Sequence, residues 1–234
     1  MFARYAARGL KAGVVAGAAF GLFVAFVGDP LVRLSEAVVA GHEHAGEAGG
    51  AVLASATSVA AGGLWGLLAG LCFGVAYYVA EPALPGGADA RSYLLAAAGF
   101  VTVAGAPWLV LPPQPAGVEP ALGTEVRLFW YATMMVAGAL VCGLSLAAYS
   151  RLQYQGRTAG LGAAVVPFVL PLGLAAVAPA AATAPDPTLA AAYRGVVASG
   201  QVLLWGTLAA AHSWLARRSS VATRETLDAP ASAD

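Results

Sequence analysis

Two histidines and two glutamates lie within one short stretch, Gly41-His42-Glu43-His44-Ala45-Gly46-Glu47. Imidazole nitrogens and carboxylate oxygens together suit borderline divalent ions such as Co²⁺, Ni²⁺, Cu²⁺ and Zn²⁺. In an extended strand His42 and His44 point to the same side, and in a helix Glu43, His44 and Glu47 share a face. The pattern predicts a metal-capture site made of His42, Glu43, His44 and Glu47. The alternative is a solvated polar loop that caps the following helix.

The third histidine, His212, lies in the apolar stretch 195–216, which also contains Ser199 and Gln201. An ionisable side chain inside a membrane-spanning helix is a candidate functional group, because placing it in lipid is costly. We expect His212 and Gln201 to line a polar route through the protein. The alternatives are that these side chains hydrogen-bond between helices, or that His212 reaches water at the inner interface.

The motifs of the common catalytic classes do not occur in this sequence. Lys11 is the only lysine and follows Leu10, so there is no Walker-type Gly-Lys pair, and G-x-S-x-G, H-E-x-x-H and C-x-x-C-H are missing as well. Two cysteines cannot make a disulfide framework. We therefore expect neither an enzyme nor a resident cofactor.

The composition places these residues in a membrane protein. Of 234 residues, 59% are apolar and 10% are charged, and the net charge is zero. The mean hydropathy is +0.75. A soluble globule of this size could not hide so much apolar surface, and a chain without net charge has no field to hold nucleic acid. This apolar and weakly charged composition indicates an integral membrane protein and excludes a large soluble domain.

Crossing the lipid takes about 20 residues of helix, and six runs without Asp, Glu, Lys or Arg are candidates, the shortest of them extended by Arg8 and Lys11, whose side chains can snorkel to the headgroups. They cover residues 12–26, 53–79, 92–111, 128–149, 160–179 and 195–216. The runs lack the alternation of a barrel, so we expect an all-α integral membrane protein, a six-helix transmembrane bundle. The alternative is five spans plus a broken helix, because Pro167 and Pro171 interrupt the fifth run. Asp29-Pro30 and Glu81-Pro82 are expected to end the first two helices.

The basic residues predict the orientation of these spans. With six spans and a cytoplasmic N-terminus, the inner side holds Arg4, Arg8, Lys11, Arg91, Arg151, Arg157, Arg217, Arg218 and Arg224, and the outer side holds Arg33, Arg127 and Arg194. We therefore expect a multi-pass protein of the cytoplasmic membrane with both termini in the cytoplasm. The membrane domain is expected to cover residues 1–218, followed by a disordered cytoplasmic tail over 219–234.

Glycine recurs at every fourth position in the first two runs. The two sets are Gly9, Gly13, Gly17 and Gly21, and Gly62, Gly66, Gly70 and Gly74. Residues four apart lie on one helix face, and a face of glycines lets two backbones approach closely in lipid, where van der Waals contact drives association. We predict that the first two helices pack through these glycines.

Three stretches resemble the CbtA family of predicted cobalt transporter subunits. They are the run from Arg8 to Gly17 that leads to Asp29-Pro30-Leu31, the proline-rich sequence Pro107-Trp-Leu-Val-Leu-Pro-Pro-Gln-Pro-Ala-Gly-Val118, and Gln201-Val-Leu-Leu-Trp205-Gly206. The proline-rich sequence is the most specific of the three. The resemblance implies cobalt uptake linked to cobalamin synthesis, often beside a small one-helix CbtB-type subunit that supplies further histidines.

We therefore expect a membrane transporter subunit that takes up a divalent cation, cobalt by the resemblance, with His42, Glu43, His44 and Glu47 concentrating the ion at the outer face. Its partners would be the lipid bilayer, the metal ion and a CbtB-type subunit, with a homo-oligomer also compatible and nucleic acid excluded. The alternatives are a non-transporting membrane anchor or assembly subunit, and a carrier for a small organic solute.

Overall fold

The computed structural model describes residues 2–40, 48–115, 118, 120–179 and 186–228, and this part of the chain contains helices and turns without strands. The helices form six segments. The first segment is α1 (Phe2–Phe23), continued by the π-helical turn η1 (Val24–Gly28) and α2 (Asp29–Ala40), and the second is α3 (Ala48–Ala80). The third is α4 (Ala88–Phe100), continued by the π-helical turn η2 (Val101–Gly105) and α5 (Ala106–Trp108), and the fourth is α6 (Thr124–Leu152) with the 3-10 turn η3 (Gln153–Gln155). The fifth consists of α7 (Arg157–Val165), the 3-10 turn η4 (Val166–Phe168) and α8 (Val169–Val177), and the sixth is α9 (Pro187–Asp228).

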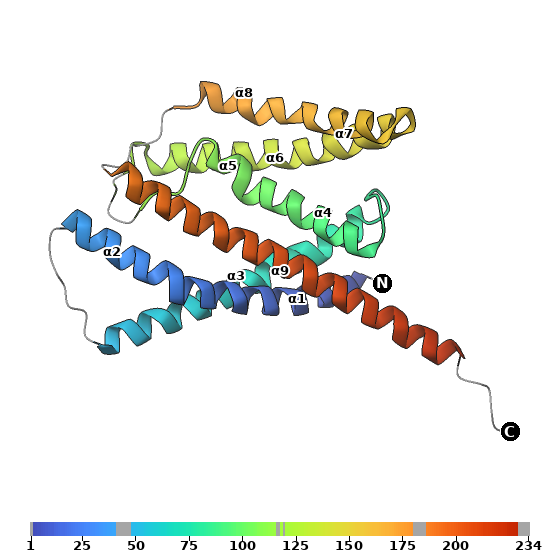
Figure 1. Ribbon diagram of the computed structural model, residues 1–234, viewed down its shortest axis with the longest axis horizontal. Coiled ribbons are helices and arrows are strands. Elements are labelled where there is room, and N and C mark those ends of the chain that lie inside the picture. The colour runs from blue at the N-terminus through green and yellow to red at the C-terminus, as the bar shows by residue number, and fades with distance from the viewer. Residues whose placement is uncertain (1, 41–47, 116–117, 119, 180–185, 229–234) are drawn as a thin grey trace.

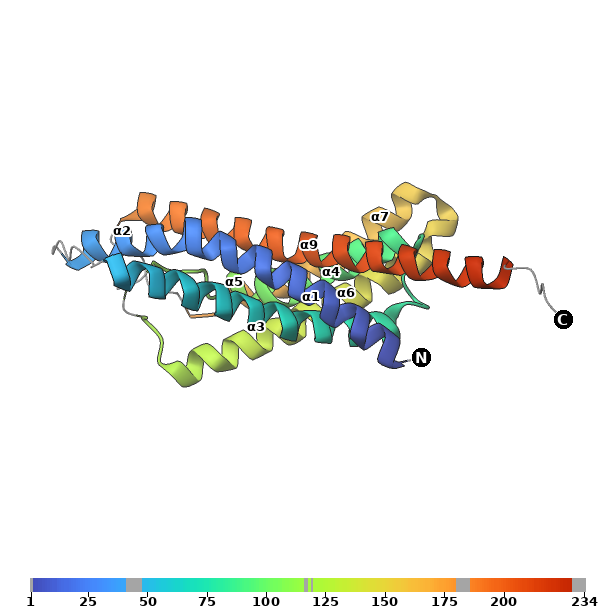
Figure 2. The ribbon, with the colours of Figure 1, turned by 90° about the horizontal axis from the view of Figure 1, so that it is seen from below.

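The six segments contact one another in a row that folds back at one side, because α3 also contacts α4. Helix α3 contacts α1, α1 contacts α9, and α9 contacts α4; α6 then contacts η2 and α5 on one side and α7 and α8 on the other. Figure 1 shows this order, with α7 and α8 at one edge and α1 and α3 at the opposite edge. The turned view in Figure 2 shows α1, α3 and α9 running alongside one another. Helix α9 is therefore an interior helix, whereas α7 and α8 form an edge.

Four helical segments are long and apolar enough to cross a membrane, by length and composition: Phe2–Leu34, Ser55–Ala80, Thr124–Gln155 and Arg157–Val177. The remaining two segments, α4–η2–α5 and α9, correspond to the expected third and sixth spans. They are the more polar ones, because α4 begins with Asp89 and Arg91, and α9 carries Gln201 and His212. The predicted all-α membrane bundle is confirmed.

The glycines of the first two helices pack against each other, as the sequence predicts. A Cβ atom built on Gly17 would lie 2.7 Å from the carbonyl oxygen of Gly62 and 2.9 Å from the Cα atom of Gly66, and one on Gly70 would lie 2.5 Å from the Cα atom of Gly13. Gly9 meets Gly70 and Gly74 in the same way. These contacts define a glycine seam, in which the backbones of α1 and α3 touch along several turns.

A polar contact closes the glycine seam at each end. At one end the Ser58 hydroxyl donates to both carboxylate oxygens of Asp29, at 2.9 Å each. At the other end the Tyr5 hydroxyl donates to a carboxylate oxygen of Glu81 at 2.5 Å. Hydrogen bonds to charged acceptors are stronger than neutral ones, so these two contacts fix the register of α1–α2 against α3.

The expectation that Asp29-Pro30 ends the first helix is wrong. The chain passes from α1 through η1 into α2 without leaving the helix. The backbone N–H of Asp29 donates to the carbonyl of Val24, five residues back. A proline in an ordinary helix clashes with the carbonyl four residues before it, and the wider π-helical turn just before Pro30 accommodates the ring. Glu81-Pro82 does follow the end of α3, which is Ala80.

The fifth segment bends where its prolines predict it. Pro167 lies in the 3-10 turn η4 between α7 and α8, and Pro171 lies within α8. The whole stretch Arg157–Val177 is still long and apolar enough to span a membrane, so it counts as a span with an interruption.

The division into a membrane domain ending at residue 218 and a tail stays a prediction. Helix α9 ends at Asp228, and residues 229–234 lie outside the described part.

The glycine seam predicts a difference between two neighbouring glycines of α3. A Cβ atom on Gly66 would collide with the backbone of Gly17, whereas one on Gly63 would meet nothing within 4 Å. We expect Gly66→Ala to lower the free energy of unfolding by about 1–3 kcal/mol through overpacking, and Gly63→Ala to leave it unchanged or raised. Both changes gain the same helix propensity. Unfolding in detergent measures the difference, and equal stability of the two variants would contradict the seam.

Candidate functional site

The residues of the predicted metal-capture site, His42, Glu43, His44 and Glu47, lie outside the described residues. They belong to the stretch 41–47 between α2 and α3, and their role stays a prediction. Among the residues that the structure does describe, no group of three or more His, Cys, Asp or Glu side chains could hold a metal ion. The functional groups that the structure places must therefore be sought inside the bundle and at its two ends.

The most buried polar contact of the described chain joins α4 to α9. The Ser92 Oγ atom lies 3.0 Å from the Nδ1 atom of His212, and both residues have an exposed fraction of 0%. The Ser92 hydroxyl also donates to the carbonyl of Ala88, one turn earlier in α4, at 3.2 Å. The other ring nitrogen of His212, Nε2, is buried without a hydrogen-bond partner among the described residues. An unsatisfied buried polar atom costs about 1–3 kcal/mol, so this nitrogen needs an explanation.

Aromatic side chains of α3 enclose the His212 ring. The ring centroid of Tyr77 lies 4.5 Å from that of His212, and the ring of Phe73 meets it edge-on at 5.2 Å. The Tyr77 hydroxyl donates to the carbonyl of Ala88 at 3.5 Å, beside Ser92. Because Phe73 and Tyr77 come from the helix that the glycine seam holds against α1, the seam positions the surroundings of the histidine.

Charged side chains surround the end of the bundle nearest to this histidine. Arg91 lies 3.9 Å from Glu81, and Arg217 lies 2.6 Å from Asp89. Both pairs are partly exposed, so each contributes at most about 1 kcal/mol. These ion pairs mark one end of the bundle. Figure 1 shows the N-terminus and the starts of α4 and α7 at this same end. We call it the inner end, following the predicted orientation.

The predicted polar route along α9 is interrupted. Gln201 accepts a hydrogen bond from the indole N–H of Trp205 at 3.2 Å, and the Trp205 ring packs on Gly99 of α4. Leu204 and Leu208, both with an exposed fraction of 0%, occupy the turns between Gln201 and His212. Gln201 and His212 therefore form two polar positions on one interior helix, separated by an apolar layer. Ser199 is exposed and bonds only within its own helix, to the carbonyl of Gly195.

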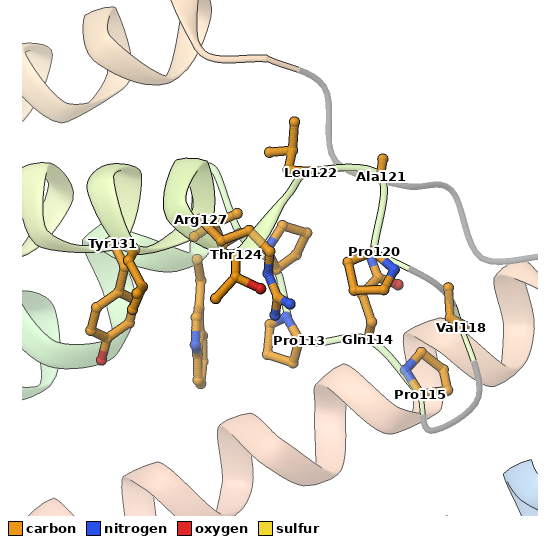
Figure 3. A pocket seen from close by; sticks show the side chains of 14 residues that line it. Pro113, Gln114, Pro115, Val118, Pro120, Ala121, Leu122, Thr124, Arg127 and Tyr131 are labelled. Carbon is orange, nitrogen blue, oxygen red and sulfur yellow. The ribbon is translucent and has the colours of Figure 1, made fainter.

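A pocket of about 690 Å³ lies at the opposite, outer end of the bundle, under the proline-rich sequence. Figure 3 shows Thr124, Arg127 and Tyr131 of α6 on one side of it and Pro113, Pro115 and Pro120 on the loop side. Arg127 is the charged member of the lining, and the Arg194 guanidinium donates to the carbonyl of Pro113 beside it at 3.2 Å. None of the described residues that line it carries a carboxylate, imidazole or thiol, which are the side chains that bind divalent metals, so this pocket is not suited to hold one.

Sequence reasoning found His212 but missed its partners. Ser92 and Tyr77 are a hydroxyl at the start of one predicted span and an aromatic near the end of another. One signal in the sequence could have linked these residues to His212. Because successive spans cross the membrane in opposite directions, residues 77, 92 and 212 all lie about one helical turn from the same membrane face. What the sequence does not reveal is that α3, α4 and α9 meet there.

Taken together, the helices and the buried polar contact define an integral membrane protein with functional groups inside an α-helical bundle. The chain belongs to the CbtA family: the model of that family, described as "Probable cobalt transporter subunit (CbtA)", matches residues 2–217. Neither the curated proteins nor the solved structures gave a match. The resemblance seen in the sequence is confirmed, and with it a membrane transport role connected with cobalt.

The contact between Ser92 and His212 predicts a matched pair of serine variants. Ser92→Ala removes the one hydrogen-bond partner that the described residues give to the buried imidazole of His212, and we expect it to lower the free energy of unfolding by about 1–3 kcal/mol. Ser199→Ala removes a serine that also bonds to the carbonyl four residues earlier but faces outward, and we expect no measurable change. Unfolding of the purified variants in detergent tests this. A Ser92→Ala protein as stable as the Ser199→Ala protein would contradict the contact.

Proposed function

We propose that this chain is the membrane subunit through which Co²⁺ enters the cytoplasm, as part of cobalt supply for cobalamin synthesis. The observation that carries the proposal is the family match over residues 2–217, nearly the whole chain. The match covers every helix that builds the bundle, including α3, α4 and most of α9. The proposal therefore concerns the assembled bundle and not an isolated motif.

The proposed orientation places both termini in the cytoplasm, with the protein in the cytoplasmic membrane. Nine basic residues then lie inside, namely Arg4, Arg8, Lys11, Arg91, Arg151, Arg157, Arg217, Arg218 and Arg224, against Arg33, Arg127 and Arg194 outside. The arrangement of the helices supports this: α2 ends at the same end of the bundle as the proline-rich sequence, opposite the N-terminus (Figure 1).

Ion capture at the outer face is assigned to His42, Glu43, His44 and Glu47. This stretch connects α2 to α3, so it lies at the outer end in the proposed orientation. Imidazole and carboxylate together bind Co²⁺ with moderate strength, which suits a site that must also release the ion. The outer pocket with Arg127 does not compete for the cation, because its described lining offers no carboxylate or imidazole ligand.

A one-helix partner of the CbtB type completes the proposed transporter. The described helices carry few acidic or imidazole side chains inside the bundle, and dehydrating a divalent ion in lipid without such ligands is prohibitive. The family is one of subunits, and a partner that brings histidines would supply the missing ligands. Helices α7 and α8, at the edge of the row, leave a span that is little buried and is free to contact another helix.

Radioactive cobalt uptake by cells that express the chain and its partner tests the proposal. We expect uptake above that of cells without the gene, with partial competition by nickel. In the double variant His42→Ala/His44→Ala, the cobalt concentration for half-maximal uptake should rise about tenfold or more, because two of four ligands are lost. The maximal rate should change little.

Two outcomes would contradict parts of this proposal. Uptake that is the same with and without the gene would favour a membrane anchor or assembly subunit. Cobalt uptake that depends on the gene but is unchanged in the double variant would remove the capture role of His42 and His44. A variant with Ser199→Ala, an exposed position on α9, controls for expression and membrane insertion.

A further inference from the structure

The two ring nitrogens of His212 differ in their surroundings. Nδ1 is held by Ser92 at 3.0 Å, whereas Nε2 is buried and has no hydrogen-bond partner in the part of the chain that the structure describes. A purely structural histidine in a helix junction would satisfy both nitrogens or place one in water. Here the ring is completely buried, so neither solution applies.

The hydrogen bonds around Ser92 assign the tautomer of this ring. The Ser92 hydroxyl lies where it can donate its one proton to the carbonyl of Ala88, at 3.2 Å, and with that donation the bond to His212 uses the proton of the imidazole. Nδ1 then carries the hydrogen, and Nε2 is a bare lone pair. The opposite tautomer would give up the bond to Ala88 and would also leave a buried N–H without an acceptor, which is rarer in proteins than an unused lone pair.

A histidine held in this way has the geometry of a metal ligand. Histidines that bind metals donate the hydrogen of one ring nitrogen to an oxygen of the protein, which fixes the ring and leaves the other nitrogen for the ion. Ser92 supplies that oxygen, and Phe73 and Tyr77 hold the ring plane by aromatic contact. Neutral imidazole is a preferred ligand of Co²⁺ and its neighbours in the periodic table.

Oxygen ligands lead from this histidine to the inner end. The Tyr77 hydroxyl lies beside Ser92, where both donate to the carbonyl of Ala88. One turn further along the chain, Glu81 carries a carboxylate that accepts from Tyr5 at 2.5 Å and lies 3.9 Å from Arg91. The backbone N–H of Glu81 donates to the carbonyl of Tyr77 at 2.8 Å, so these two residues are successive steps of one helix end.

We propose that the Nε2 atom of His212 is a ligand of the transported Co²⁺ on the inner half of its path, with Ser92 as the positioning residue. This inference rests on the proposed function and adds the atom at which the ion is held. The His212 ring is fully buried and packs against the rings of Phe73 and Tyr77, so the ion reaches Nε2 when α3 and α9 separate at the inner end. Glu81 then accepts the ion on the way to the cytoplasm.

The sequence allows a direct test, because the chain has three histidines. In the variant His42→Ala/His44→Ala, His212 is the only imidazole, provided that purification uses a tag without histidine. The protein is labelled with ring-¹⁵N histidine and placed in lipid nanodiscs. We expect one protonated and one bare ring nitrogen signal, assigned to Nδ1 and Nε2. Paramagnetic Co²⁺ should broaden the Nε2 signal beyond detection, and Mg²⁺ should leave it in place.

The controls separate this inference from the proposed function. Ser92→Ala in the same background should remove the fixed tautomer and weaken the effect of Co²⁺ about tenfold, whereas Ser199→Ala should change neither. An Nε2 signal that persists in millimolar Co²⁺ would overturn the inference, even if cells take up cobalt through this chain. Absence of cobalt uptake by the wild-type chain with its partner would instead overturn the proposed function, and the ring signal would still decide whether His212 binds the ion.

Discussion

Direct contact between the backbones of α1 and α3 is the constraint on which the rest of the structure depends. In lipid the hydrophobic effect does not drive helices together, so their association depends on van der Waals contact. The glycines at every fourth position provide it, since even one Cβ atom at Gly17 or Gly66 would not fit. With α3 held against α1, and α1 against α9, Phe73 and Tyr77 are brought to the ring of His212.

The interior position of α9 explains why its polar residues are tolerated. Gln201 and His212 would be costly on a lipid-facing helix, but α9 lies between α1 and α4. There Ser92 of α4 bonds to His212, and Trp205 of α9 itself bonds to Gln201. Between them Leu204 and Leu208 close the interior. The described state is thus a closed one, with polar positions toward each end of one helix. In the proposed transport, the helices around α9 would have to move.

Much of the fold could be predicted from the sequence because lipid restricts the options. Runs of apolar residues gave the six helical segments, and the glycine spacing gave the seam between the first two. The error at Asp29-Pro30 arose because a proline stops a regular helix, whereas η1 widens the helix before Pro30. The pair Ser92–His212 could not be predicted, because hydropathy does not encode which helices become neighbours. The role of His42, Glu43, His44 and Glu47 remains a prediction from residue type alone.

The central claim is that this bundle conducts Co²⁺ across a membrane, and the most direct measurement is cobalt entry into sealed liposomes. The purified chain would be reconstituted alone and with a one-helix partner, and a metal-sensitive dye inside the vesicles would report the ion. The account predicts that Co²⁺ enters faster than in vesicles without protein, while Mg²⁺ does not. Entry of Co²⁺ at the protein-free rate in both preparations would contradict it.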